Sequence, residues 1–278
     1  FKNIMLINCK RTLIDLSSPK VMGILNCTPD SFFDGGKYKD EQSLLTQAEK
    51  MVADGADFID IGAYSSRPDA GFVAEEEELR RIVPVVEMLN KNFPEAILSI
   101  DTFRAKIAEA CINAGAAIVN DISAGRLDEN MLPTVGRLKV PYIMMHMRGN
   151  PQTMQSLTQY DDIVSDMLFY FSERIAAARD HGIDDLIIDP GFGFAKTLEQ
   201  NYEVLNKLEL FKITGLPILA GLSRKSMIYR LLGTTPAEAL NGTTALNTIA
   251  LIKGANILRV HDMKEAVETV KLVLNFEL

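Results

Sequence analysis

The sequence predicts a parallel α/β barrel of the (β/α)8 TIM type, preceded by an N-terminal β-hairpin. Three observations lead to this fold. Short apolar runs alternate with helix-length segments eight times along the chain. Each apolar run stops abruptly at polar or turn-forming residues, first at Asn26. The length of 278 residues suits one such barrel, since these typically contain about 250 residues. An open doubly wound sheet is the alternative, but eight regular units favour closure.

The strands are read in chain order from these apolar runs. Residues 4–7 and 12–16 flank a polar turn, which predicts a hairpin that would cover the bottom of the barrel. The segments between later runs are long enough for helices, so the barrel strands should be parallel. The eight expected strands are residues 21–25, 57–61, 97–100, 117–119, 142–145, 186–188, 217–222 and 256–260.

The helices are read from apolar residues at helical spacing and from their end signals. Gly55, Gly115 and Gly182 are predicted to end helices. Glu75–Glu78 suit the positive end of a helix dipole and are expected to form a solvated face. Ser226 is expected to cap a helix. The expected helices are residues 40–53, 75–91, 105–114, 129–137, 161–181, 199–208, 227–232, 243–253 and 264–276, with a helical insert at 236–240.

Composition indicates an ordinary soluble protein. The formal net charge of −8 argues against non-specific nucleic-acid binding. No uncharged stretch is long enough for a membrane span, and residues 1–10 lack a signal-peptide pattern. Cys9, Cys27 and Cys111 are widely spaced and form no metal motif, which suggests a reduced cytoplasm. No linker divides the chain, so residues 1–278 are expected to form one domain.

Nearly every predicted strand ends in a group that can donate, accept or ionise. A barrel brings all these ends to one mouth. Helix capping explains a single such group, but caps do not require Lys, Arg or His. The residues concerned are Asn26, Asp60, Asp101, Asn120, His146, Asp189, Ser223, Lys225, Arg259 and His261.

The groups on the first and last strands suit an anion. Asn26, Arg259 and His261 should be neighbours once the barrel closes, and their oxygen and cations suit a phosphate-like ligand. Mg²⁺ would fit beside it, because this ion uses few protein oxygens and accepts phosphate oxygens. Ser226 at a helix N-terminus could hold a second anion. Two anions around one pocket suggest a transferase that joins two molecules.

The groups on the middle strands suit a flat ligand. Asp101, Asn120 and Asp189 match a ring rich in N–H donors, such as a purine or a pterin. Phe194 and Met145 are candidate apolar walls, although core packing also explains a methionine. Simpler readings remain for single residues. Asp189 could stabilise a turn, His146 could be a core histidine, Asp60 could bond Arg67 or a neighbouring strand end, and His181 should lie on the surface.

Together, these segments resemble the dihydropteroate synthases of folate biosynthesis, the targets of sulfonamides. The resemblance runs from about residue 21 to the C-terminus and is specific because many motifs occur in the family's order. They are MGILNCTPDSF at 22–32, DIG at 60–62, SSRP at 65–68, SIDT at 99–102, NDI at 120–122, MHMRGNP at 145–151, DPGFGF at 189–194, SRKS at 223–226 and RVHD at 259–262.

The resemblance implies a transferase that condenses 6-hydroxymethyl-7,8-dihydropterin diphosphate with p-aminobenzoate by an SN1-like displacement. It implies Mg²⁺ as cofactor and a homodimer formed through the last outer helices. The resemblance implies a set of residues for each ligand. Asn26 would bind Mg²⁺, while Arg259, His261 and Ser66 would hold the diphosphate. The implied pterin residues are Asp101, Asn120, Asp189, Lys225, Met145 and Phe194, and the implied p-aminobenzoate residues are Phe32, Arg67, Pro68, Lys225 and Ser226.

Two other classes share this barrel pattern. A pterin-dependent methyltransferase would keep the pterin carboxylates but would not need Lys225, Ser226 or the diphosphate cations. A non-catalytic pterin-binding barrel should have lost some of Asn26, Arg67, Lys225 and His261, and all four are present. The resemblance to the synthases also implies that Asp101, Asp189 and Lys225 are the catalytic residues.

Overall fold

The fold is an eight-stranded parallel barrel surrounded by helices. The computed structural model describes residues 4–10, 12–27, 37–63, 73–150 and 152–276. Eight strands form one sheet in the order β8-β7-β6-β5-β4-β3-β10-β9, and all their pairings are parallel. A parallel bridge between Ile188 and Ile218 joins its two edges. The predicted barrel is thus confirmed, with its seam between β8 and β9.

The strands fall close to the predicted positions. They are short and mostly buried, as expected where helices cover the outer face of a parallel sheet. The barrel strands are β3 (Lys20–Asn26), β4 (Phe58–Gly62), β5 (Ile97–Asp101), β6 (Ile118–Asp121), β7 (Tyr142–Met145), β8 (Leu186–Asp189), β9 (Leu219–Ala220) and β10 (Ile257–Val260).

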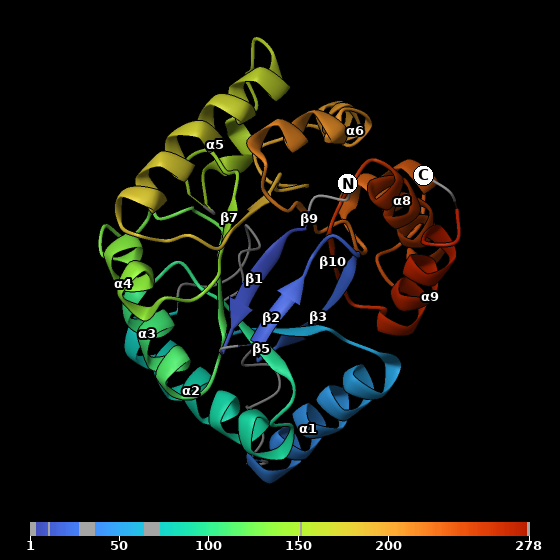
Figure 1. The fold of residues 1–278 in the computed structure, drawn as a ribbon. Coiled ribbons are helices and arrows are strands. Elements are labelled where there is room, and N and C mark those ends of the chain that lie inside the picture. Colours follow the sequence, from blue (N-terminus) through green and yellow to red (C-terminus); the bar gives the residue numbers. More distant parts are fainter. Residues whose placement is uncertain (1–3, 11, 28–36, 64–72, 151, 277–278) are drawn as a thin grey trace.

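The helices form an outer ring around this sheet (Figure 1). The α-helices are α1 (Lys37–Asp54), α2 (Glu75–Asn92), α3 (Ala105–Asn113), α4 (Met131–Leu138), α5 (Ile163–Asp180), α6 (Leu198–Asn206), α7 (Ser226–Leu232), α8 (Leu240–Ile252) and α9 (Met263–Val273). The described residues also include the 3-10 helices η2 (Met154–Ser156) and η3 (Leu208–Thr214). η3 was not expected as a separate element.

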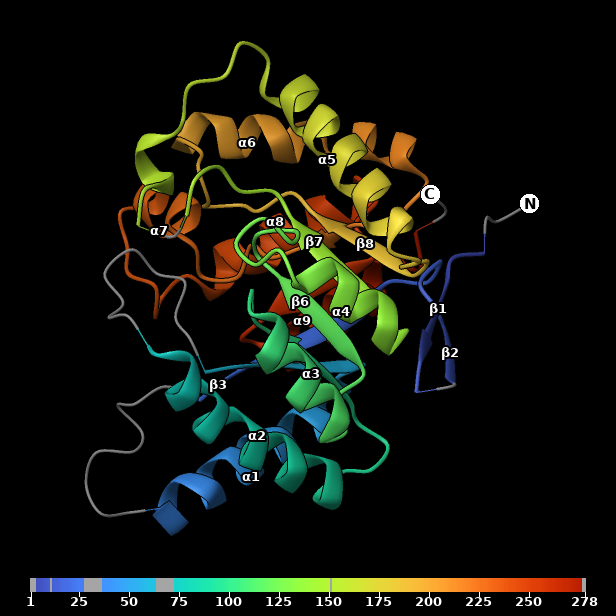
Figure 2. The ribbon, with the colours of Figure 1, turned by 90° about the vertical axis from the view of Figure 1, so that its left-hand side faces the viewer.

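The N-terminal hairpin covers the bottom of the barrel, as predicted. β1 (Leu6–Cys9) pairs antiparallel with β2 (Thr12–Asp15). Ile7 packs in one apolar cluster with Met22 and Ile257, near the amino ends of β3 and β10. Figure 2 shows the hairpin at one end of the barrel. The opposite end, where the strands finish, is therefore left for a ligand site.

The predicted insert at residues 236–240 is a turn rather than a helix. The hydroxyls of Thr234 and Thr235 donate to the Glu238 carboxylate at 2.7 and 3.0 Å. The carbonyls of Pro236 and Ala237 accept from the Arg224 guanidinium. The backbone bonds here are those of a turn, from the Glu238 N–H to the Thr235 carbonyl and from the Ala239 N–H to the Pro236 carbonyl. The side-chain bonds compete with the bonds that a helix would make.

The expectation of a solvated face at Glu75–Glu78 is wrong for Glu78. This residue is only 1% exposed. Its carboxylate accepts from Arg104 and, at 3.1 Å, from the Thr102 hydroxyl. Burial raises the pKa of Glu78, and the Arg104 charge opposes that rise. The buried pair joins the first turn of α2 to the segment that follows β5.

Candidate active site

The carboxyl ends of the strands place the predicted polar groups on one edge of the barrel. Asn26, Asp101 and Asp189 are the last residues of β3, β5 and β8. Asn120 lies opposite Asp101 in the strand register. Arg259 lies on β10, which pairs with β3, so the predicted closeness of the first and last strands is confirmed.

Arg259 joins two buried carboxylates at this edge. Its Nε donates to Asp60 Oδ2 and its Nη2 to Asp101 Oδ2, both at 2.7 Å. Asn120 Nδ2 donates to the same Asp60 oxygen at 3.0 Å. Asp60 is fully buried, whereas the Asp101 side chain keeps 22% exposure. The prediction that Asp60 bonds a neighbouring strand end is confirmed; Arg67 lies outside the described residues.

These contacts set the protonation states of Asp101 and Arg259. Burial raises the pKa of Asp101 to about 7, although Arg259 opposes the rise and Asp60 adds to it. Burial also lowers the pKa of Arg259, but the carboxylates of Asp60 and Asp101 outweigh this effect and raise it overall. Arg259 is therefore a permanent cation, while Asp101 titrates near neutral pH.

Lys225 is the second cation of the mouth. It lies at the N-cap of α7, and its Nζ donates to the carbonyl of Phe192. The same Nζ is 4.9 Å from the ring centroid of Phe194, a distance typical of a cation–π contact. Burial lowers the pKa of Lys225 to about 8, and Asp189 opposes the shift.

Asp189 has both a structural and an electrostatic role. Its Oδ1 accepts from the backbone N–H of Gly191 at 2.8 Å, which is the contact expected if Asp189 stabilises the turn. Burial raises its pKa, and the charge of Lys225 is the main opposing effect. The residue is 7% exposed, so its carboxylate remains part of the wall of the mouth.

Met145 and Phe194 belong to one small apolar cluster next to these charges. Met145 is 3% exposed and packs with Ile122 and Met147, while Phe194 is half-buried against them. The arrangement combines an apolar surface with Asp101, Asn120 and Asp189. It suits a flat ring that has N–H groups on its edge.

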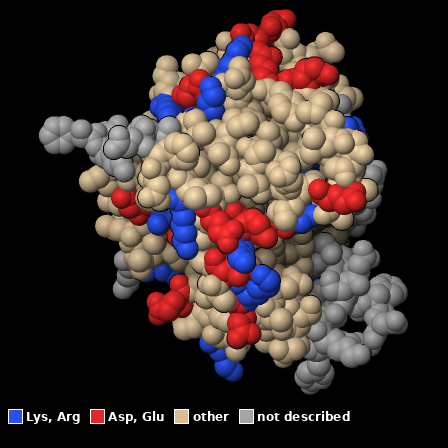
Figure 3. Space-filling model, turned by 90° about the vertical axis from the view of Figure 1, so that its right-hand side faces the viewer, with Lys and Arg blue, Asp and Glu red and all other residues tan. Residues whose placement is uncertain are grey.

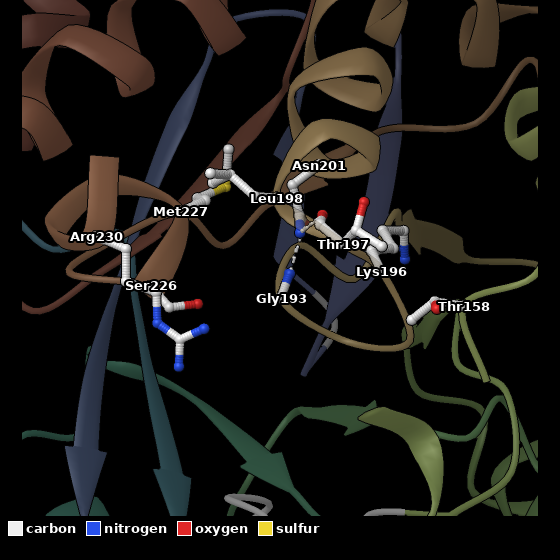
Figure 4. Close-up of a pocket in the computed structure, with 9 residues that line it drawn as sticks. All are labelled: Thr158, Gly193, Lys196, Thr197, Leu198, Asn201, Ser226, Met227 and Arg230. Carbon is white, nitrogen blue, oxygen red and sulfur yellow. Dashed lines mark hydrogen bonds between the residues drawn. The ribbon is translucent and has the colours of Figure 1, made fainter. Parts of the chain in front are cut away.

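Ser223, Ser226 and His261 lie on the β9 and β10 side. The Ser223 hydroxyl is 3.0 Å from His261 Nδ1 and also accepts from the His261 backbone N–H at 3.2 Å. Ser226 is the first residue of α7 and makes no capping bond, so the predicted cap is wrong; Lys225 holds the N-cap position. Ser226 lines a cavity of about 220 Å³ beside the mouth, with Gly193 and Arg230 among the other lining residues (Figure 4).

Several predicted residues cannot be placed. Phe32, Ser66, Arg67 and Pro68 lie outside the described residues. Asn26 is described and exposed at the end of β3. Within the described part of the chain, no group of three or more His, Cys, Asp or Glu side chains could hold a metal ion.

Lys196 was missed by the reasoning from sequence. It lies beyond Asp189, the last residue of β8, and so was not among the residues predicted from the strand ends. The side chain is nevertheless 5% exposed, and its Nζ lies 3.1 Å from His146 Nδ1. A cation directly after the apolar run 192–195 was the only available signal. The reading of His146 as a satisfied core histidine is confirmed, and His181 is exposed as expected.

Known proteins resemble this chain over nearly its whole length. A family model described as pterin binding enzyme matches residues 22–261. The dihydropteroate synthase of Escherichia coli K12 is 44% identical over 264 residues, which cover 94% of this chain and 93% of the relative. That of Bacillus subtilis is 42% identical over 91% of this chain and 87% of the relative.

Solved structures agree with the sequence matches. Yersinia pestis dihydropteroate synthase in complex with a sulfonamide drug superimposes with a TM-score of 0.91 at 42% identity, covering 97% of this chain and 98% of the other. The Xanthomonas albilineans enzyme with 4-aminobenzoic acid has a TM-score of 0.90 at 39% identity, with 97% of both chains covered. By its family match, its relatives and its structural neighbours, this chain belongs to the dihydropteroate synthase family of pterin-binding enzymes.

Proposed function

We propose that this chain condenses 6-hydroxymethyl-7,8-dihydropterin diphosphate with p-aminobenzoate to form 7,8-dihydropteroate and diphosphate. The observation that supports the proposal is the set of side chains at the mouth of the barrel. Asp101, Asn120 and Asp189 present acceptors around the apolar surface of Met145 and Phe194. A pterin has a flat face for that surface and N–H donors for those acceptors.

The diphosphate would lie on the side of β3 and β10. Arg259 supplies a permanent positive charge there, and His261 and Ser66 are the further proposed contacts. Asn26 offers one amide oxygen at the mouth, which fits a Mg²⁺ ion held mainly by phosphate oxygens. Bound Mg²⁺ would neutralise charge that develops on the leaving diphosphate.

The reaction is an SN1-like displacement in this proposal. The bond between the pterin methylene and the diphosphate oxygen breaks, and its electron pair leaves with the diphosphate. The resulting cation is conjugated with the pterin ring, and Asp101 and Asp189 provide negative charge beside it. The amine of p-aminobenzoate is neutral at pH 7, so it attacks without a strong base and then loses a proton.

The p-aminobenzoate site is proposed from Lys225 and Ser226 at the start of α7, together with Phe32, Arg67 and Pro68, which lie outside the described residues. Lys225 contacts Phe194 and so borders the pterin surface as well. This position lets one lysine face both substrates. A methyltransferase would have no use for that arrangement, and the relatives named above are synthases.

A homodimer is proposed through the outer helices α7, α8 and α9. Large apolar side chains are exposed there: Leu231, Leu232, Ile249, Ile252 and Leu272. Figure 3 faces this side and shows a broad area with few charged residues. Sedimentation of the protein and of the Ile252→Asp variant would test it, because a charge on the interface should yield monomers.

A cytoplasmic location is also proposed, since Cys9, Cys27 and Cys111 are all free and buried. Within the described residues, no helix combines the length and apolar character needed to span a bilayer.

A diphosphate-release assay tests the main proposal. The purified chain is given the dihydropterin diphosphate with and without p-aminobenzoate and Mg²⁺. Release of diphosphate together with dihydropteroate supports the proposal. Absence of product under every condition would refute it.

A further inference from the structure

Lys196 is a buried amine that forms no ion pair at salt-bridge distance among the described residues. Burial lowers its pKa to about 7, and the charge of Asp189 opposes the shift, so Lys196 is an ammonium at mildly acidic pH. Its Nζ lies 3.1 Å from His146 Nδ1 and 3.0 Å from each of the carbonyl oxygens of Gly191 and Phe194. An ammonium has three N–H donors, so these acceptors satisfy all of them. Because a buried charge is costly unless it is hydrogen-bonded, the arrangement points to a specific role.

The two carbonyls belong to the loop that follows β8. Lys196 holds the carbonyls of Gly191 and Phe194, and Lys225 holds that of Phe192 between them. Gly191 and Gly193 have φ angles of +66° and +82°, which lets the chain turn its carbonyls toward the two lysines. The loop conformation therefore depends on both ammonium groups.

A second bond fixes the same loop from its outer side. Asn201 on α6 accepts from the Gly193 N–H at 2.7 Å, the dashed contact in Figure 4. Its Nδ2 donates to the Thr197 carbonyl at 2.6 Å. The loop is thus held at its outer side by α6 and at its inner side by Lys196.

His146 contacts Lys196 from the position directly after β7. It follows Met145 directly, is 2% exposed and packs edge-on against Tyr170, with ring centroids 4.9 Å apart. Burial and the charge of Lys196 hold the pKa of His146 well below its usual range. A neutral imidazole that accepts at Nδ1 must carry its proton on Nε2.

We propose that Lys196 is a positioning residue for the pterin pocket, which acts by tying the loop of residues 191–194 to His146, the residue that follows β7. Phe194 is thereby held as a pocket wall, and the Phe192 carbonyl is held where Lys225 meets it. The inference rests on the proposed pterin site. It adds a residue that contacts neither substrate yet determines how well the pterin fits.

The test is pterin binding to the Lys196→Met variant, measured by calorimetry with 6-hydroxymethylpterin as probe. Methionine keeps much of the side-chain volume but leaves the three acceptors without their donor. We expect binding to weaken by roughly 10- to 100-fold, since displacement of a positioned group by about 1 Å has effects of that size. The KM for the dihydropterin diphosphate should rise more than kcat falls.

Lys207→Met is the matched control, because Lys207 forms only an exposed pair with Glu203 on α6. It should bind the probe as the wild type does. If the wild type binds no pterin, the proposed function fails. If the wild type binds and Lys196→Met binds equally well, only the role of Lys196 fails.

Nitrogen NMR gives a readout that needs no variant of Lys196. The chain has three histidines, so His146 can be assigned from single His→Asn variants. At mildly acidic pH, where Lys196 is charged, we expect His146 to be neutral with an unprotonated Nδ1. A proton on Nδ1 would overturn the proposal even if Lys196→Met did not fold, because the ammonium could not then donate to that nitrogen.

Discussion

Replacing Asp60 with asparagine tests whether the charge network at the mouth is built as the structure shows. Asp60 Oδ2 accepts from Arg259 Nε at 2.7 Å and from Asn120 Nδ2 at 3.0 Å. Asparagine can keep both bonds only if its oxygen takes that place. Its NH₂ group then takes the place of Oδ1, which has no hydrogen-bond partner among the described residues.

Two costs follow from this geometry. Breaking a buried ion pair typically costs about 3–5 kcal/mol, and Arg259 should fall at the low end because it retains Asp101. The buried NH₂ group without an acceptor costs about 1–3 kcal/mol by itself, which overlaps with the first term. We therefore expect Asp60→Asn to lower the free energy of unfolding by about 3 kcal/mol, or Tm by roughly 6–10 °C.

Urea unfolding of the two proteins measures this difference. Glu203→Gln is the control, since it removes one charge from an exposed pair and should change stability by less than about 1 kcal/mol. The same substitution should also lower the pKa of Asp101, because the negative charge of Asp60 raises it. Equal stability of Asp60→Asn and the wild type would refute the reasoning.

Three further predictions concern pH, charge and backbone. The pKa of Asp101 is raised to about 7 and that of Lys225 is lowered to about 8, so Asp101 is anionic above the first value and Lys225 cationic below the second. The pH profile of kcat/KM should therefore peak between about 7 and 8, and a flat profile from about 6 to 9 would contradict these roles. Asp101→Asn should lower kcat by about 10²–10³-fold in single-turnover assays, with a smaller rise in KM; unchanged turnover would exclude an electrostatic role. Gly191→Ala should lower the free energy of unfolding by more than about 2 kcal/mol, because φ is +66° and the new Cβ would lie 2.3 Å from the carbonyl oxygen of His146. Gly215→Ala, with φ of +69° and no atom within 4 Å, should cost only about 1 kcal/mol in the same urea unfolding experiment, and equal costs would argue against the close approach.

The barrel could be predicted because its signal is local. Strands of a helix-covered parallel sheet are short apolar runs, and nearly every one ends at a polar residue in this chain. The turn near Pro236 could not be predicted in the same way. Its carbonyls bond Arg224, and that partner lies before α7 in the sequence. Glu78 is similar, since its burial depends on Arg104 from the segment after β5.

Most of the site was predictable from the residues at strand ends. Asp101, Asn120 and Arg259 follow from the rule that a parallel barrel brings its strand ends together. Lys196 lies past the strand end, and a lysine is normally exposed. Its burial arises from two carbonyls and an imidazole that the loop presents only after folding. Such partners leave no periodic pattern in the sequence.

The ion pairs of Arg259 with Asp60 and Asp101 link diphosphate binding to the charge around the pterin in the proposed reaction. Arg259 was predicted to face the diphosphate, and in the structure its guanidinium bridges Asp60 and Asp101. A diphosphate at this place would compete with Asp101 for the same cation. Because Arg259 lowers the pKa of Asp101, any weakening of that pair raises this pKa and shifts Asp101 toward its neutral form, until a developing pterin cation supplies the opposing charge. Asp60, fully buried, would continue to hold the guanidinium in place. The network therefore couples diphosphate binding to the electrostatics of the pterin pocket through a single arginine.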